Sequence, residues 1–119
     1  MILKKKIKII KLRKGNIIKF FDFNKKILKK FEEIYFSEVK KKYFKGWKIH
    51  KKRNQLLTIT SGTIEFYFKK KINGKISKIR MSYPKKIYLL FIPKNTFYSF
   101  KCLSKVNGMI VNIIDEKVI

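Results

Sequence analysis

Apolar and polar residues alternate along short segments of this chain, most regularly between residues 63 and 70. There Ile64, Phe66 and Phe68 share one face and the residues between them share the other, which is the pattern of a strand buried on one side. Comparable segments predict further strands over 17–21, 31–39, 55–60, 75–81, 87–92, 97–102 and 109–114. Residues 2–13 mix Lys and Ile in a way that fits either a strand or a basic helix, and residues 22–30 are expected to form an irregular connection.

Turn residues separate these segments at short intervals. Asn73-Gly74 is the strongest hairpin signal, because both central positions of a type I′ turn favour residues that tolerate a positive φ. Ser61-Gly62, Pro93-Lys94-Asn95 and Asn107-Gly108 mark other turns. Short strands joined in this way predict an all-β sandwich or small barrel, and the length of 119 residues predicts a single domain over 1–119.

Charge is the most extreme feature of the composition, with 32 Lys and Arg residues against 7 Asp and Glu and a formal net charge of +25. Such a charge attracts nucleic acid, a membrane surface or phosphorylated small molecules. The lysines are spread over every segment, however, and arginine, which makes better forked contacts with phosphate and guanine, occurs only at Arg13, Arg53 and Arg80. Enrichment in Lys, Ile, Asn and Phe, all with A/T-rich codons, offers compositional drift as the other explanation.

The sequence offers few residues for disulfides, zinc sites, a signal peptide or a membrane span. Cys102 is the one cysteine, which excludes an internal disulfide and a cysteine-based zinc site, and its apolar surroundings predict a small buried side chain. The N-terminal residues carry charge throughout, unlike a signal peptide. Since no segment approaches the ~20 apolar residues that cross a bilayer, a cytoplasmic protein without a membrane partner is expected.

Residues 43–62 concentrate the candidate chemistry. They contain His50 and Trp47, the single histidine and the single tryptophan, together with a dense set of cations. Histidine is the side chain whose ordinary pKa lies nearest to neutral pH, so proton transfer in this chain is expected to pass through His50. A histidine in a basic strand is also commonly a surface or packing residue, and that interpretation stays open.

The same segment resembles a family. Gly46-Trp47-Lys48-Ile49-His50-Lys51-Lys52, followed by Gln55 and Ser61-Gly62, resembles the RGxHxHKKxxQ…G segment of small sugar-nucleotide cupins. These are the dTDP-4-keto-6-deoxyglucose 3,4-ketoisomerases and the RmlC-like dTDP-4-keto-6-deoxyhexose 3,5-epimerases. Similar segments follow the family's order at Glu33-Ile34-Tyr35-Phe36, at Ile92-Pro93 with Phe97-Tyr98-Ser99-Phe100, and at Val111-Asn112-Ile113-Ile114-Asp115. The resemblance implies a jelly-roll cupin with a pocket inside the barrel mouth near His50, Tyr35 and Tyr98.

Three positions depart from the family pattern. Lys48 replaces the first of the two motif histidines, the usual base in the epimerases, Lys45 replaces the Arg before the Gly, and Tyr98 stands where the family has a His. Either His50 has taken over as the base, or the chain is a diverged relative with another activity or none. Metal-dependent cupins use two or three histidines with a carboxylate, so neither a metal nor another cofactor is expected.

Both family reactions move a proton on a carbon beside a ketone through an enediol or enolate. They need a base of near-neutral pKa, an acid, and a group that stabilises the oxyanion. The resemblance implies His50 as the base and Tyr35 or Tyr98 as the acid or shuttle. Lys48, two residues before His50 on the same face of a strand, would stabilise an enolate and lower the pKa of His50.

Further residues are expected to contact the substrate or to support the base. Trp47 and Phe36 would stack on a sugar or a base, although Trp47 points away from His50 in a regular strand. Lys51, Lys52 and Arg53 would hold a diphosphate, with the motif glutamine Gln55 beside them. Asp115 would support a protonated His50 or lie exposed near the terminus. The competing interpretations make the tyrosines core or rim aromatics and the lysines a solvated face.

The sequence therefore predicts a metal-independent isomerase or epimerase of a nucleotide-linked 4-keto-6-deoxy sugar in surface-polysaccharide biosynthesis. A non-catalytic cupin that binds a sugar nucleotide is the first alternative, favoured by the missing first histidine. A basic nucleic-acid-binding barrel with exposed aromatics is a further one, disfavoured by the even spread of lysine. Family relatives pair as dimers by exchanging N-terminal strands, so residues 2–13 are expected to do this in a homodimer.

Overall fold

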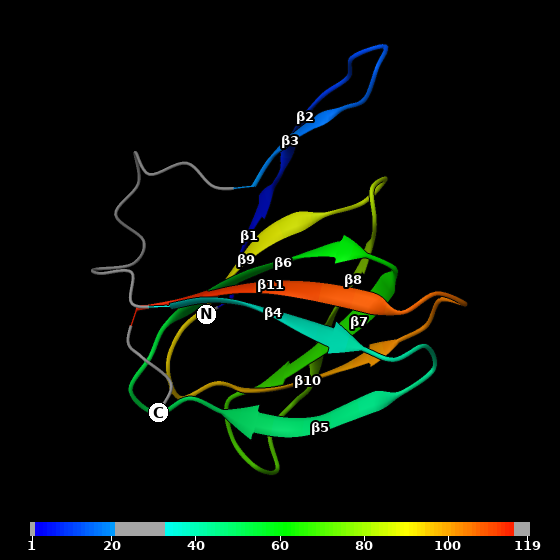
Figure 1. The fold of residues 1–119 in the computed structure, drawn as a ribbon. Coiled ribbons are helices and arrows are strands. Elements are labelled where there is room, and N and C mark those ends of the chain that lie inside the picture. Colours follow the sequence, from blue (N-terminus) through cyan, green and yellow to red (C-terminus); the bar gives the residue numbers. More distant parts are fainter. Residues whose placement is uncertain (1, 21–32, 116–119) are drawn as a thin grey trace.

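Two antiparallel sheets face each other in this computed structural model, which describes residues 2–20 and 33–115 (Figure 1). The described residues form strands β1 (Leu3–Lys6), β2 (Lys8–Ile10), β3 (Ile17–Lys19), β4 (Glu33–Val39), β5 (Phe44–Ile49), β6 (Gln55–Ser61), β7 (Thr63–Lys69), β8 (Ser77–Ser82), β9 (Tyr88–Ile92), β10 (Phe97–Cys102) and β11 (Gly108–Ile114). The larger sheet has the order β1-β9-β6-β11-β4, the smaller sheet has the order β5-β10-β7-β8, and β2 pairs with β3. The predicted all-β jelly-roll fold is confirmed.

Most predicted strands agree with the observed ones to within one or two residues. The segment 97–102 coincides with β10, and along β7 Ile64, Phe66 and Phe68 are buried while the residues between them are partly exposed. The ambiguous segment 2–13 is extended, because β1 pairs with β9 and so satisfies the backbone groups along that edge of the larger sheet. The connection predicted over 22–30 lies outside the described residues.

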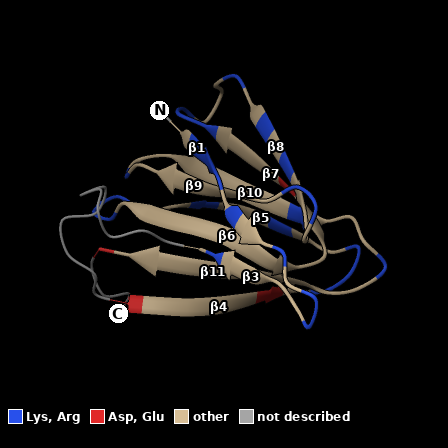
Figure 2. Ribbon diagram, turned by 90° about the horizontal axis from the view of Figure 1, so that it is seen from above, with Lys and Arg blue, Asp and Glu red and all other residues tan. Residues whose placement is uncertain are grey.

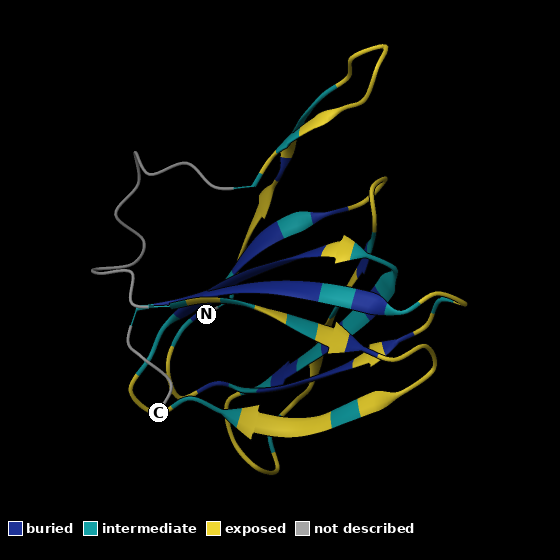
Figure 3. Cartoon of the chain, viewed as in Figure 1, coloured by how far each residue is buried: buried dark blue, intermediate teal, exposed yellow. Residues whose placement is uncertain are grey.

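The core takes residues from both sheets, and β6 and β11 of the larger sheet are buried along most of their length (Figure 3). Phe66 is fully buried, with its ring centre 6.4 Å from that of Phe68 and 5.8 Å from that of Phe100. Leu57 and Ile110 of the larger sheet are buried in the same cluster. Cys102 is fully buried as well, which confirms the prediction of a small buried side chain.

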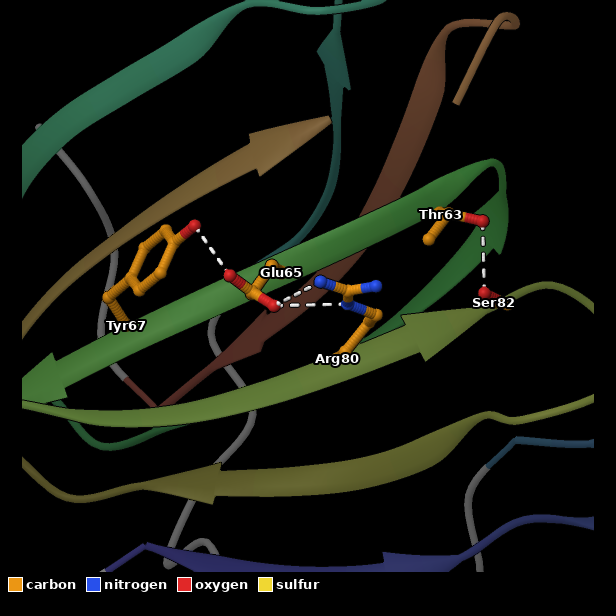
Figure 4. Close-up of polar contacts among 5 residues, drawn as sticks. All are labelled: Thr63, Glu65, Tyr67, Arg80 and Ser82. Atoms are coloured by element: carbon orange, nitrogen blue, oxygen red, sulfur yellow. Dashed lines mark hydrogen bonds and ion pairs between the residues drawn. The ribbon is translucent and has the colours of Figure 1, made fainter. Parts of the chain in front are cut away.

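The outer face of the smaller sheet carries a polar cluster that joins β7 to β8 (Figure 4). The Tyr67 hydroxyl donates to Glu65 Oε1 at 2.8 Å, and Arg80 Nη2 lies 2.9 Å from Glu65 Oε2. These bonds lower the pKa of Glu65, the Tyr67 hydrogen bond most strongly. Because Glu65 and Arg80 are directly opposite each other, the cluster supports the β7–β8 register from outside and leaves the inner face to apolar residues.

Lysine and arginine are distributed over strands and turns of both sheets and do not form a single stripe (Figure 2). Acidic side chains near them are few: within the described ranges Glu38 pairs with Lys40 at 3.5 Å and Glu65 pairs with Arg80. Residues 2–20 and 33–115 contain no helix that is long and apolar enough to span a membrane. Most lysines and arginines of residues 2–20 and 33–115 therefore have no ion pair with a carboxylate of these same residues.

Candidate functional site

His50 and Tyr98 meet between the sheets. His50 directly follows β5, and Tyr98 lies on the neighbouring strand β10, opposite Lys48. The Nε2 atom of His50 is 2.9 Å from the Tyr98 hydroxyl, and the two ring centres are 5.6 Å apart. Tyr98 is only 4% exposed. The structure thus joins the predicted base directly to one of the two predicted acids.

The larger sheet supplies polar side chains to the same interior. Tyr35 of β4 lies opposite Asn112 of β11, and Gln55 at the start of β6 donates from Nε2 to Asn112 Oδ1. Gln55 and Asn112 are both buried. Gln55 Oε1 is a buried acceptor without a hydrogen-bond partner in the described part of the chain, so it is available to a donor group of a ligand.

A break in the register of β5 and β10 brings two lysines to the inner side. Lys48 lies opposite Tyr98 and Lys45 lies opposite Phe100, with the irregularity between them. In a regular strand, residues three apart point to opposite faces, and the extra residue of a bulge removes this difference. Both ammonium groups lie over the Phe100 ring, Lys45 at 5.9 Å and Lys48 at 6.0 Å, and Lys45 donates to Ser37 Oγ at 3.3 Å.

Arg53 supplies a third cation. Its charge adds to the lowering of the His50 pKa and opposes the larger rise that burial causes in the pKa values of Tyr35 and Tyr98. Arg53 therefore lies within electrostatic range of all three. Arg53 Nη1 is buried and has no hydrogen-bond partner among the described residues. A buried guanidinium nitrogen without an acceptor is costly, and an anionic ligand would supply that acceptor.

These surroundings favour the neutral form of His50. Burial lowers the pKa of His50, and the charges of Arg53 and Lys48 lower it further. Lys48 acts on the pKa of His50 in the expected direction, after burial and Arg53. His50 is therefore unprotonated near neutral pH, as a general base must be.

The two tyrosines, in contrast, are kept in their protonated form. Burial raises the pKa of Tyr98 far above its ordinary value of 10.0, with a further rise from Tyr35, against the opposing effects of Gln55 and Arg53. Burial likewise raises the pKa of Tyr35. Both phenols remain protonated and can donate, while the neighbouring imidazole can accept.

A hydrogen-bonded clamp holds the loop that carries His50 and Arg53. Asp115, which follows β11, accepts the Asn54 backbone N–H at 3.0 Å and the Asn54 side-chain amide at 3.2 Å. Asn54 Oδ1 in turn accepts the Lys94 backbone N–H at 2.8 Å, and the His50 carbonyl accepts the backbone N–H of Asn95 at 2.8 Å. Asp115 thus bonds to Asn54, which departs from both roles expected for it.

Four of the predicted substrate contacts lie away from this cluster. Trp47 lies on the outer face of the smaller sheet, with Lys69 Nζ 4.2 Å above its ring. Phe36 is 66% exposed and, as the neighbour of Tyr35 on β4, points to the other side of its sheet. Lys51 and Lys52 are exposed in the turn between β5 and β6. Arg53 and Gln55 are the predicted contacts that the structure brings to His50.

Three contributors were not expected from sequence reasoning: Lys45, Asn54 and Asn112. Asn112 carried a recognisable signal, since it is a polar residue inside the apolar run 109–114. Within the described residues, no group of three or more His, Cys, Asp or Glu side chains comes together as a metal site would require. The donors around His50 are phenols, amides and cations, which suit an anionic organic ligand better than a metal ion.

Comparison with known proteins finds similar structures but no similar sequence family. No protein-family model matches the chain, and no curated protein sequence matches it. A dTDP-sugar isomerase from Desulfovibrio desulfuricans G20 superposes with a TM-score of 0.87 at 23% identity, over 97% of this chain and 76% of that one. The RmlC 3,5-epimerase from Legionella pneumophila, in complex with dTDP-4-keto-L-rhamnose, gives a TM-score of 0.82 at 15% identity, over 99% and 68%.

A third similar structure is the TDP-quinovose 3,4-ketoisomerase WlaRB from Campylobacter jejuni, with a TM-score of 0.78 at 19% identity, over 99% of this chain and 87% of that one. Two facing antiparallel sheets, with an apolar core and a polar cluster around His50, match the jelly-roll fold of these structures. More particularly, the fold is that of the RmlC-like sugar-nucleotide cupins. The family resemblance stated from the sequence is therefore confirmed at the level of the fold.

Proposed function

We propose that this protein is a metal-independent isomerase or epimerase that moves a proton beside the ketone of a nucleotide-linked 4-keto-6-deoxy sugar. The observation that carries the proposal is the hydrogen bond of 2.9 Å between His50 Nε2 and the Tyr98 hydroxyl, inside the sandwich. The lowered pKa of His50 keeps the imidazole able to accept a proton, and the raised pKa of Tyr98 keeps the phenol able to donate one. The similar folds of dTDP-sugar isomerases and epimerases support the choice of substrate.

The proposed reaction begins when neutral His50 takes the proton from the carbon next to the ketone. The C–H electron pair becomes a C=C bond, and the carbonyl π pair moves onto oxygen to form an enolate. Lys48 lies close enough to His50 for its charge to lower the pKa of the imidazole, and we assign its ammonium group to stabilising this oxyanion.

Two outcomes branch from the same intermediate. In 3,4-isomerisation the hydroxyl proton on O3 passes to O4, and the proton that was taken from C3 is delivered to C4. In epimerisation a tyrosine delivers its proton to the opposite face of the carbon that was deprotonated, and His50 keeps the proton that it took. We assign Tyr98, which bonds to His50, and Tyr35, which comes from the facing sheet, as the two proton donors.

The rest of the substrate would lie toward the mouth of the sandwich. We propose that Arg53 binds the diphosphate through its unpartnered Nη1, with Lys51 and Lys52 in the same turn adding long-range attraction. We also propose a homodimer by exchange of N-terminal strands. In it, β1 would pair with β9 of the other copy in the register that it takes here within one chain.

The replacement of the first motif histidine by Lys48 favours a second candidate, a cupin that binds a sugar nucleotide without turning it over. The test is incubation with dTDP-4-keto-6-deoxyglucose, followed by NMR identification of products, for the wild type, Tyr98→Phe and Tyr83→Phe. Tyr83 is a partly exposed tyrosine remote in sequence from the cluster. Turnover that falls at least tenfold in Tyr98→Phe and persists in Tyr83→Phe supports the enzyme. Nucleotide binding without turnover in any of the three would establish the binding protein instead.

A further inference from the structure

A cavity of about 570 Å³ has neither His50 nor any of its partners in its lining. It is lined by the turn between β7 and β8 and by Ile2 near the N-terminus, and its apolar lining includes Phe68 and Ile79. Lys70, Lys71 and Lys75 also line it. This volume lies within the range of small-molecule sites, and an apolar interior with ammonium groups suits an anionic amphiphile.

Aliphatic side chains stand out into solvent around the same cavity. Ile72 is 72% exposed at the β7–β8 turn, Ile76 after it is 46% exposed, and Leu3 beside Ile2 is 52% exposed. Single exposed apolar residues are common, but here Ile76 lines the apolar cavity, and Ile72 and Leu3 directly follow the lining residues Lys71 and Ile2. Together they form an apolar patch that water does not favour.

This patch is embedded in positive charge. Residues 2–6 and 68–79 contain no Asp or Glu, and their lysines are Lys4, Lys5, Lys6, Lys69, Lys70, Lys71, Lys75 and Lys78. Figure 2 shows Lys and Arg along β1 and β8, which lie at the same edge of the two sheets. We call the three exposed aliphatic residues and these lysines the lysine–isoleucine surface.

We propose that the lysine–isoleucine surface docks the protein on an anionic lipid bilayer. Ile72 and Ile76 insert at the boundary of the acyl chains, the lysines contact the headgroups, and the cavity receives one acyl chain. Interfacial binding of this kind combines buried apolar area with attraction to anionic lipid. The proposal goes beyond the function of the His50 site and departs from the expectation of no membrane partner.

The composition of the surface argues against two other occupants. Single-stranded nucleic acid binds to aromatic rings on which its bases stack, whereas the exposed apolar residues here are aliphatic. A second copy of the same surface would set eight lysines against eight, without a carboxylate from residues 2–6 or 68–79 to pair with them. A bilayer that contains anionic lipid offers both the negative charge and the apolar depth.

The insertion is tested with a fluorescent reporter. Ile72→Trp is made in a Trp47→Phe background, so that the new indole is the only one, and the protein is mixed with phosphatidylcholine vesicles with or without phosphatidylglycerol. We expect a blue shift, and quenching by brominated acyl chains, only with the anionic vesicles. An unshifted spectrum in near-physiological salt overturns the proposal, and so does an equal shift with single-stranded DNA, which would assign the surface to nucleic acid.

A matched pair of variants separates insertion from general charge attraction. Ile72→Ser/Ile76→Ser removes the exposed isoleucines, whereas Leu103→Ser/Val106→Ser removes two partly or largely exposed apolar residues between β10 and β11. We expect the first pair to weaken vesicle binding at least tenfold and the second to change it less than twofold. Equal losses in the two pairs contradict the proposal.

The cavity has its own test. Lysophosphatidylglycerol, below the concentration at which it forms micelles, presents one acyl chain and one anionic headgroup. We expect it to shift the NMR methyl resonances of Ile2 and Ile79 while leaving those of Val106 in place, and glycerol phosphate, the headgroup alone, to shift none of them. Methyl groups of Ile2 and Ile79 that do not respond to the lipid show that no acyl chain enters the cavity.

Discussion

The chemistry assigned to this protein depends on how His50 is kept neutral while the phenols around it stay protonated. Burial and the cations Arg53 and Lys48 lower the pKa of His50, while Tyr98 lies beside His50 and Tyr35 comes from the facing sheet. Burial acts in the same direction as the cations on the imidazole, and it raises the pKa values of both tyrosines. The same surroundings therefore keep the base neutral and the acids protonated, and the side-chain partner of His50 among the described residues is a phenol.

Replacing Lys48 by Gln is expected to raise the pKa of His50 toward its ordinary value of 6.5 and leave it below that value, because burial remains. The NMR titration of the single imidazole measures this directly. The acid limb of the pH–activity profile should move to higher pH in the same variant, because the neutral fraction of His50 falls. Lys51→Gln, in the exposed turn, is the control. Equal shifts in both variants, or a downward shift in Lys48→Gln, would contradict the assignment of Lys48.

The lowered pKa of His50 also has a consequence for stability. The unfolded chain has a histidine of ordinary pKa, near 6.5, so between the folded and unfolded values the unfolded state binds more protons. The contribution of His50 to the free energy of unfolding is therefore fully present above pH ~6.5 and is lost as the pH falls through the folded pKa. His50→Gln should remove this part of the pH dependence in denaturant titrations. An unchanged pH dependence in the variant would count against the lowered pKa.

At the scale of elements, the Asn54–Asp115 clamp joins the loop after His50 to the end of β11. The donors and acceptors of the clamp allow the residues at positions 54 and 115 to be exchanged. In Asn54→Asp/Asp115→Asn, the new carboxylate at 54 can accept the Lys94 N–H and an amide proton from position 115. The amide oxygen at 115 can still accept the backbone N–H of residue 54. Each single substitution sets like groups against each other, two carboxylates or two amides.

We therefore expect each single variant of the clamp to lower the free energy of unfolding by about 1–2 kcal/mol, and the double variant to recover most of that loss. The resonances of the His50 ring should move in the singles and return in the double, because the same loop positions the imidazole. Denaturant titration and NMR of the four proteins measure the two effects. If the double variant loses as much free energy of unfolding as the two single variants together, or more, Asn54 and Asp115 do not stabilise the loop through their mutual hydrogen bonds.

The turn between β6 and β7 requires a glycine at position 62. Gly62 has a φ of +80°, and a Cβ there would lie 2.9 Å from Ser104 Oγ and 3.0 Å from the Gly108 backbone. Gly62→Ala is expected to lower the free energy of unfolding by about 2 kcal/mol or more, through strain and crowding. Gly46→Ala is the control, since a Cβ there has no neighbour within 4 Å and no positive φ is involved. Thermal denaturation that ranks the two variants equally would contradict this reading of the turn.

The sequence predicts those strands and turns whose signals come from neighbouring residues, and it does not predict contacts between distant residues. Alternation along 63–70 and the turn residues around 97–102 depend on near neighbours, and β7 and β10 agree with the prediction. Residues 2–13 were ambiguous because only pairing with β9, far along the chain, decides for a strand. Asn54 and Asp115 are 61 residues apart, a separation at which neither residue carries a local signal of the other.

The candidate site shows the same division between local and distant information. The family-like segment indicated His50, Lys48 and Gln55, and strand alternation correctly indicated that Trp47 points away. Lys45 was missed because it faces inward only through the irregular pairing of β5 with β10. Such an irregularity is a property of two strands together, and the sequence of β5 alone does not show it.

At the scale of the whole molecule, the net charge of +25 acts across a body whose principal extents are 47 × 35 × 26 Å. The Debye length falls from about 30 Å at 0.01 M salt to about 8 Å at 0.15 M, so like charges repel across much of the molecule only at low salt. We expect the melting temperature to rise by about 5 °C or more over this range. A melting temperature that is unchanged or falls with added salt would show that the repulsion is already balanced.

The measurement that tests the central claim most directly is proton exchange on the substrate. The wild type and His50→Ala are each incubated with dTDP-4-keto-6-deoxyglucose in D2O, and NMR follows deuterium at C3 and C5 of the sugar. The account predicts that deuterium enters at C3 with the wild type and not with His50→Ala, and deuterium at C5 as well would indicate 3,5-epimerisation. If neither protein exchanges a carbon-bound proton while the nucleotide still binds, His50 is not a base and the protein is a binding cupin.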